Sequence, residues 1–137
     1  MKISQKLEYA CRALVQLARQ HDIKTLTRLE QLAKREAVSA NFLVQILNDL
    51  RRAGLIESRR GKSGGYLLAM PPEEITLRQV VGAVEPGLLQ STVSAEGESG
   101  GGVRQAWEGV SNALCNALDA TTIADIAQQS GGPMFYI

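Results

Sequence analysis

The sequence predicts a mainly α-helical fold with one small β-hairpin, and three observations support this fold class. In several segments, apolar residues recur every three or four positions, which is the period of an amphipathic helix. Two short strand-like runs, 55–59 and 66–69, flank a glycine-rich turn at 60–65. A last helical stripe follows a glycine- and serine-rich stretch, so we expect helices on both sides of the hairpin.

Length and composition fit one ordinary domain, or one small domain with an attached oligomerisation element. The chain has 137 residues, of which 45% are hydrophobic and 21% are charged. No apolar run is long enough for a membrane span, and the N-terminus lacks the apolar core of a signal peptide. We therefore expect a cytoplasmic protein without membrane contact.

The first helix is expected at residues 2–19, where apolar side chains share one face. Lys2 or Ser4 would open it. The polar connector that follows contains His21, the single histidine of the chain. Because no serine or cysteine partner accompanies this histidine, the sequence offers no nucleophilic site, and it also lacks a C-x-x-C motif. We therefore do not expect an enzyme.

The next two helices form a helix-turn-helix pattern. Thr27 and Glu30 have the spacing of a capping box, which predicts the start of a helix. A turn at 36–38 precedes Ser39, whose hydroxyl can accept a hydrogen bond from a first-turn amide of the following helix. That helix carries apolar residues on one face and ends at Gly54. The second helix of such a unit enters the major groove of DNA.

The hairpin after the helix-turn-helix reads as a wing. Its glycines allow the backbone to approach a sugar-phosphate wall, and its arginines can neutralise phosphates or enter a narrow minor groove. A plain surface hairpin with solvated charges is the alternative, which the preceding helix-turn-helix disfavours. The candidate DNA-binding residues on the outward face of the helix and in the wing are Asn41, Val44, Gln45, Arg51, Arg59, Arg60 and Lys62.

Charge is unevenly divided along the chain, although the whole sequence has a net charge of only +1. Residues 1–70 carry 13 lysines and arginines against 6 acidic residues, a net charge of +7. Residues 71–137 carry 2 against 8, a net charge of −6. A basic front half that faces a polyanion, with an acidic rear half that faces away, is expected of a DNA-binding protein with a separate regulatory or dimerising part.

Three further helices are predicted beyond the hairpin. The first is capped by Thr76 and is broken at Pro86. Residues 90–102 have no hydrophobic period and are expected to form a flexible loop. Helices are then expected at 106–118 and 122–129, followed by an unassigned tail.

The helix at 106–118 carries an apolar stripe made of Trp107, Val110, Leu114 and Leu118. The stripe can fold back on its own domain or pair with the same helix of a second subunit. We favour pairing, because a winged helix is complete without it and a two-fold axis sets two recognition helices one DNA turn apart. The last helix is then expected to contact the partner's first helix. The predicted fold is a winged helix-turn-helix domain at 1–85, a flexible loop at 86–102, and a long dimerisation helix with a C-terminal helix at 103–137.

Family-like motifs run through nearly the whole chain. They are KLEYACRALVQLA at 6–18, VSANFLVQILNDLRRAGLIESRRGKSGGYLLAMPPEEITLRQVVGAVE at 38–85, and WEGVSNALCNALDATTIADI at 107–126. These motifs resemble the Rrf2 family of bacterial regulators, which includes IscR, NsrR and CymR. The resemblance implies a homodimeric winged-helix transcription factor, usually a repressor, that binds an imperfect palindrome in double-stranded DNA.

The resemblance also implies roles for individual residues. Val44 departs from the pattern, since several members have a carboxylate at this position. A valine can instead contact a thymine methyl group, so the operator sequence is expected to differ from those of members with a carboxylate at this position. The family's recognition-helix contacts match Ser39, Asn41, Phe42 and Gln45, and its minor-groove contact matches Arg60.

Cluster-binding members of the family place three cysteines in the loop before the dimerisation helix, because thiolates hold iron-sulfur centres. Here that loop contains serines and no cysteine, and Cys11 and Cys115 lie in helical segments. We therefore expect no cofactor, and in particular no ordinary three-cysteine iron-sulfur cluster. A mixed-ligand centre that uses Glu8 and Cys11 is the alternative.

Each cysteine is expected to pack in the core as a small hydrophobe, or else to act as a redox-active thiol. A structural disulfide is not expected in the cytoplasm. By resemblance to members without a cluster, the effector is expected to be a small molecule, a partner protein or oxidation. The alternative function is a winged helix that serves as a protein-interaction module, which the basic wing disfavours.

Overall fold

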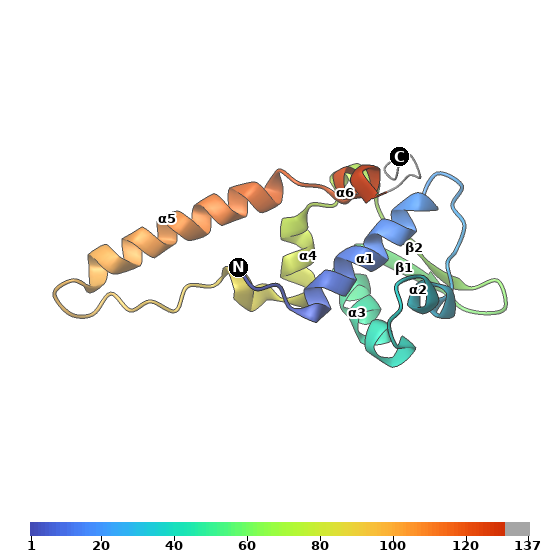
Figure 1. The fold of residues 1–137 in the computed structure, drawn as a ribbon, viewed down its shortest axis with the longest axis horizontal. Coiled ribbons are helices and arrows are strands. Elements are labelled where there is room, and N and C mark those ends of the chain that lie inside the picture. The colour runs from blue at the N-terminus through green and yellow to red at the C-terminus, as the bar shows by residue number, and fades with distance from the viewer. Residues whose placement is uncertain (131–137) are drawn as a thin grey trace.

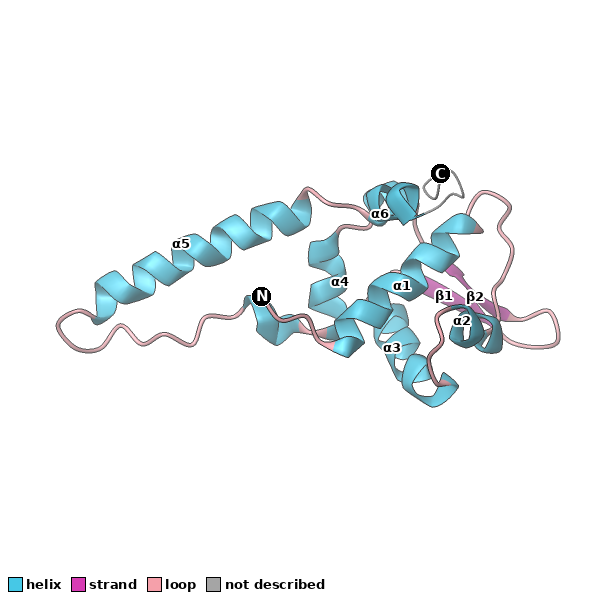
Figure 2. Cartoon of the chain, viewed as in Figure 1, coloured by secondary structure: helices cyan, strands magenta, loops and turns pink. Residues whose placement is uncertain are grey.

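The structure is a computed structural model that describes residues 1–130; the predicted tail, which begins at Gly131, lies outside the described residues. Figure 1 shows a helical body with a hairpin at one end and a long helix projecting from the other. Figure 2 confirms the predicted fold class, mainly α with one β-hairpin. The elements are α1 (Gln5–Arg19), α2 (Leu29–Arg35), α3 (Ala40–Arg52), β1 (Ile56–Arg59), β2 (Gly65–Leu68), η1 (Pro72–Glu74), α4 (Leu77–Val84), η2 (Pro86–Leu89), α5 (Gly100–Asp119) and α6 (Ile123–Ser130).

Helix α1 is the centre of the core and packs against α3, α4, α6 and β2 (Figure 1). Its inner face is fully buried, and so are the apolar side chains of α3 that meet it. Burying a leucine or isoleucine side chain contributes about 1.5–3 kcal/mol. This packing fixes which face of α3 points outward. The largest fully buried side chains in these two helices are Leu14, Leu17, Leu43, Ile46, Leu47 and Leu50.

Three of the predicted helix starts are confirmed by their capping contacts. Ser4, one of the two candidates for α1, accepts from the Leu7 amide at 3.1 Å. Ser39 accepts from the Phe42 amide at 3.1 Å, which starts α3. Thr76 accepts from the Gln79 amide at 3.2 Å, and the Gln79 side chain accepts from the Thr76 amide at 2.9 Å. Each cap satisfies a first-turn amide that has no partner within its helix.

The predicted capping box of α2 was wrong. The residue before α2 is Arg28, whose amide donates to the Gln31 side-chain oxygen at 3.0 Å. Thr27 is instead buried, at 2% exposure, and its backbone exchanges two hydrogen bonds with Tyr66 of β2. The spacing of a hydroxyl and a carboxylate cannot show that the backbone of Thr27 pairs with a strand that is distant in the sequence.

Helix α5 begins earlier than predicted, because residues 100–102, assigned to the flexible loop, form its first turn. Glycine disfavours helices, which made this stretch read as a loop. In the structure, a Cβ on Gly100 would lie 2.6 Å from the Ala95 carbonyl carbon. Glycine at this position therefore permits a close backbone approach where the helix starts. The predicted loop also contains η2, which follows α4 at once.

The two C-terminal helices differ in how they contact the body. Helix α6 packs against α1 of its own chain, and the expected contact with a partner's first helix stays a prediction. Ile123 is fully buried, and its amide donates to the Ile75 carbonyl at 2.8 Å. Helix α5, in contrast, has no buried residue and extends away from the body (Figures 1 and 2). Among residues 1–130, no helix combines the length and apolarity that a bilayer crossing requires.

Candidate nucleic-acid interface

The first turns of α3 present side chains outward, opposite the buried face. Asn41 and Gln45 are exposed, and Val44 is partly exposed. Asn41 and Gln45 are four residues apart, so they share one face of the helix about 6 Å apart along its axis. Amide and methyl groups at this position are suited to hydrogen bonding and apolar contact with base edges.

Ser39 and Phe42, also predicted as DNA contacts, have structural roles in the same turn. The Ser39 hydroxyl is the N-cap of α3. The half-buried Phe42 ring packs edge-on against Tyr9 of α1, with ring centroids 6.1 Å apart and planes at 81°. The Arg12 guanidinium lies 5.1 Å from the Tyr9 ring centroid on the same helix. These contacts hold the N-terminus of α3 against α1.

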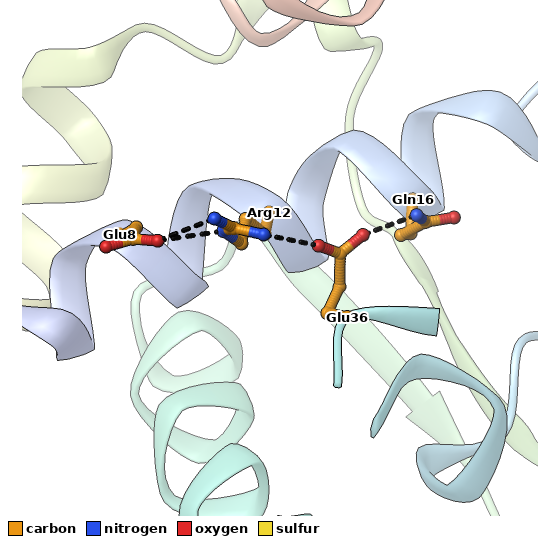
Figure 3. Close-up of polar contacts among 4 residues, drawn as sticks. All are labelled: Glu8, Arg12, Gln16 and Glu36. Carbon is orange, nitrogen blue, oxygen red and sulfur yellow. Dashed lines mark hydrogen bonds and ion pairs between the residues drawn. The ribbon is translucent and has the colours of Figure 1, made fainter. Parts of the chain in front are cut away.

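The turn before α3 is held from α1 by a chain of polar contacts (Figure 3). Arg12 pairs with Glu8 at 2.7 Å and with Glu36 at 3.3 Å, and the Gln16 amide donates to Glu36 at 2.5 Å. Glu36 ends α2, and the next residue, Ala37, has a positive φ of 54°. The four side chains thus fix the tight turn that sets the angle between α2 and α3.

A second polar contact fixes α3 further along its length. The Asp49 carboxylate pairs with Lys6 at 2.5 Å and also with Arg52. The hydrogen bond from Lys6, together with the charges of Lys6 and Arg52, lowers the pKa of the Asp49 carboxyl. Asp49 is therefore ionised at neutral pH and links the start of α1 to α3.

The wing is a two-stranded antiparallel hairpin in which Ile56 pairs with Leu68 and Arg59 with Gly65. Its tip, residues 60–63, is exposed, so Arg60 and Lys62 reach solvent as predicted. The turn requires glycine at position 64, because a Cβ there would lie 2.3 Å from the Arg59 carbonyl oxygen. The glycines therefore produce a tight, projecting, positively charged tip.

Two contacts that the sequence did not predict attach the wing to the segment before α2. The Thr27 amide donates to the Tyr66 carbonyl at 2.9 Å, and the Tyr66 amide donates to the Thr27 carbonyl at 2.8 Å. The Arg28 guanidinium donates to the Lys62 carbonyl at 2.8 Å. No local sequence signal indicates these pairings, because the partners are more than thirty residues apart. The wing is thereby held to the helix-turn-helix.

Arg51 lies apart from Asn41 and Gln45, at the other end of α3. Its side chain donates to the Ser58 hydroxyl of β1 at 3.4 Å. It lines a polar cavity of about 290 Å³ between α2, the end of α3 and the wing, which we call the arginine-lined cavity. The arginines around this cavity are Arg28, Arg51, Arg59 and Arg60.

The predicted dimerisation stripe is divided by the structure. Trp107 and Val110 are each 56% exposed, and with Leu114 they line an apolar groove of about 270 Å³ beside η2 and residues 90–93. Leu118 instead packs against the core of its own chain. Three of the four stripe residues therefore form one surface, while the fourth serves the intrachain contact.

The two cysteines lie on different helices, Cys11 on α1 and Cys115 on α5, and both are half-buried. Burial raises the pKa of the Cys11 thiol to about 11. This thiol is therefore protonated at neutral pH, which disfavours nucleophilic and metal-binding chemistry. Within the part of the chain that the structure describes, no three histidine, cysteine or acidic side chains gather as a metal-binding group.

The sequence is similar to known regulators over almost its full length. Residues 3–129 match the Rrf2 family, described as iron-dependent transcriptional regulators. The HTH-type transcriptional regulator CymR of Bacillus subtilis strain 168 is 33% identical over 141 residues, covering 100% of both proteins. The regulator IscR of Cereibacter sphaeroides is 37% identical over 141 residues, covering 97% of this chain and 91% of that protein.

The fold is similar to solved structures of a CymR and an IscR. The structure of CymR, the global cysteine regulator of B. subtilis, aligns with a TM-score of 0.82 at 32% identity, covering 94% of this chain and 98% of that chain. The structure of T. potens IscR aligns with a TM-score of 0.76 at 27% identity, covering 100% and 97%. Because the family match spans most of the chain and the relatives align over nearly their whole length, this protein belongs to the Rrf2 family of transcriptional regulators.

Proposed function

We propose that the protein is a homodimeric repressor that binds an imperfect palindrome in double-stranded DNA. The observation that carries this proposal is that the exposed N-terminal face of α3 and the positively charged wing tip belong to one unit, in which hydrogen bonds join the wing to the helix-turn-helix. A helix in the major groove and a wing in the adjacent minor groove require such a fixed relationship.

The chemistry of the exposed side chains supports specific roles in base recognition. Gln45 and Asn41 carry amides, which can form paired hydrogen bonds to adenine. Val44 can contact a thymine methyl group, and Arg60 at the wing tip can enter a narrow minor groove. Lys62 and Arg59 supply phosphate contacts that raise affinity without carrying sequence information.

The exposed apolar surface of α5 supports dimer formation. Trp107 and Val110 are large apolar side chains that the described chain leaves 56% exposed. A second copy of α5, placed by a two-fold axis, would bury them and would present two recognition helices to neighbouring half-sites. Exposed apolar patches of this kind mark interaction surfaces.

The donor set does not fit the iron-sulfur cluster of cluster-binding family members. The chain has two cysteines, and neither lies in the segment between α4 and α5, where three thiolates would be required. We therefore propose that the effector is a small molecule, a partner protein or thiol oxidation rather than an ordinary three-cysteine cluster. Cys11 is a weak candidate for oxidation because its pKa is raised to about 11.

The experiment is a gel-shift with the DNA upstream of the protein's own gene, at two salt concentrations. We expect the shifted complex to be displaced by an excess of the same unlabelled duplex but not by an unrelated duplex. We also expect binding to weaken as the salt concentration rises. Gln45→Ala should lose discrimination at one base pair, and Arg60→Ala should lower the salt slope by about one unit. Arg104→Ala is the charge-matched control, since Arg104 lies on α5 and pairs with Glu108 at 3.0 Å. If the protein were instead a protein-interaction module, it would show little affinity for any duplex, and that affinity would depend only weakly on salt.

A further inference from the structure

The arginine-lined cavity has a net positive lining. Its four arginines are opposed by one acidic lining residue, Glu30, and a second acid nearby, Glu57, lies 3.7 Å from Arg59. Guanidinium groups keep their charge at any pH near neutral. Cations from three different elements therefore converge on one opening, an arrangement suited to an anion.

Arg28 is held in place at this cavity. Its Nη1 atom donates to the Lys62 carbonyl at 2.8 Å. This hydrogen bond connects the start of α2 to the tip of the wing. A guanidinium carries five N–H donors, so this bond leaves others for a ligand. Because the Arg28 guanidinium is already oriented, its side chain loses less conformational freedom when it forms a planar pair of hydrogen bonds to an anion.

The position of the cavity identifies the anion. It lies between the last turn of α3 and the wing, with Arg51 on one side and Arg60 on the other. If α3 occupies a major groove and the wing the adjacent minor groove, one sugar-phosphate strand must pass between them. In that arrangement, a phosphate of that strand would be the negatively charged group that meets this opening.

We propose that the arginine-lined cavity binds one backbone phosphate of the strand that separates the two grooves, with Arg28 as a principal phosphate-binding residue. The inference rests on the proposed DNA-binding function and names the part of the DNA that this cavity receives. Because a phosphate carries no sequence information, the contact strengthens binding to every duplex and sets how far the wing lies from α3.

The test measures affinity against salt concentration by fluorescence anisotropy, with an operator duplex and an unrelated duplex. Arg28→Ala is expected to make the negative slope of log K against log salt less steep by about one unit. On both duplexes, it should also weaken binding about fivefold at 0.15 M salt. Arg28→Lys should restore the slope, because an ammonium group also displaces one counterion. Arg104→Ala is the control for loss of one positive charge elsewhere.

Thermal unfolding of each variant verifies that the fold is intact. A wild-type slope for Arg28→Ala would overturn the proposal, even if its operator affinity fell. An Arg28→Lys slope as low as that of Arg28→Ala would also overturn it, because the loss would then not be one of charge. These failures differ from failure of the proposed function, in which the wild-type protein itself would bind neither duplex.

Discussion

The backbones of Thr27 and Tyr66 exchange two hydrogen bonds, of 2.9 and 2.8 Å, although the residues belong to different parts of the chain. The bridge extends the hairpin sheet to the segment that leads into α2. Tyr66 is also paired with Ser58 of β1, so the wing is held on both sides. The helix-turn-helix and the wing are therefore joined by backbone hydrogen bonds, as the proposed contact with two neighbouring grooves requires.

Thr27→Pro should test this attachment, because proline cannot donate the backbone hydrogen bond to Tyr66. We expect the free energy of unfolding to fall by about 1 kcal/mol or more. DNA affinity should fall further than this loss of stability explains, since the wing is released. Urea unfolding and anisotropy measure the two effects. Thr27→Val, which keeps the backbone donor and the side-chain shape, is the control; equal DNA affinities for the two variants would contradict the attachment.

Gly64→Ala should distort the tip of the wing, because its Cβ would lie 2.3 Å from the Arg59 carbonyl oxygen. We expect at least a tenfold loss of DNA affinity, with the helical circular dichroism signal retained. Gly82→Ala on α4 is the matched control, since nothing lies within 4 Å of its added Cβ. That variant should gain up to about 1 kcal/mol of stability from helix propensity. Wild-type DNA affinity for Gly64→Ala would show that the wing tip does not contact DNA.

Trp107→Glu should separate the subunits, because it places a charge in the middle of the exposed apolar surface of α5. Sedimentation velocity should show a dimer for the wild type and a monomer for the variant, and operator affinity should fall at the same time. Asn112→Glu introduces the same charge at another exposed position of α5 and should remain dimeric. A wild-type protein that sediments as a monomer at micromolar concentration would contradict this role of α5.

The Cys11 thiol should react slowly, since burial disfavours the charged thiolate and raises its pKa from 9.0 to about 11. At pH 7 the thiolate fraction is then about a hundredfold smaller than in the unfolded chain. In a Cys115→Ser background, the rate of alkylation by iodoacetamide should rise about tenfold per pH unit from pH 7.5 to 10. A rate that levels off near pH 8 would show an accessible, activated thiol and would support oxidation of Cys11 as the signal.

Local features of the fold could be predicted from the sequence. Ser39 as a cap and Gly54 as a helix end depend on nearby residues, and the structure confirms both, with a φ of 81° at Gly54. Pairings across long sequence distances could not be predicted. Thr27 looked like a cap but pairs with Tyr66, and Arg28 carries no periodic signal that points to the wing.

The same limit applies to the boundaries and to the candidate site. The predicted face of α3 was correct because burial follows helical period, so Gln45 is exposed as expected. The start of α5 was misplaced because the role of Gly100 depends on contact with Ala95. Leu118 fits the apolar spacing of the stripe, yet spacing alone cannot tell an intrachain contact from one between subunits.

The most direct test of the account is selection of bound sequences from a random duplex library by the purified protein at physiological salt. We predict that the recovered duplexes share two half-sites related by a two-fold axis and separated by one DNA turn, and that Gln45→Ala relaxes one symmetric pair of positions. Recovery of no shared sequence, with the wild-type protein folded and at a concentration sufficient to dimerise, would contradict it.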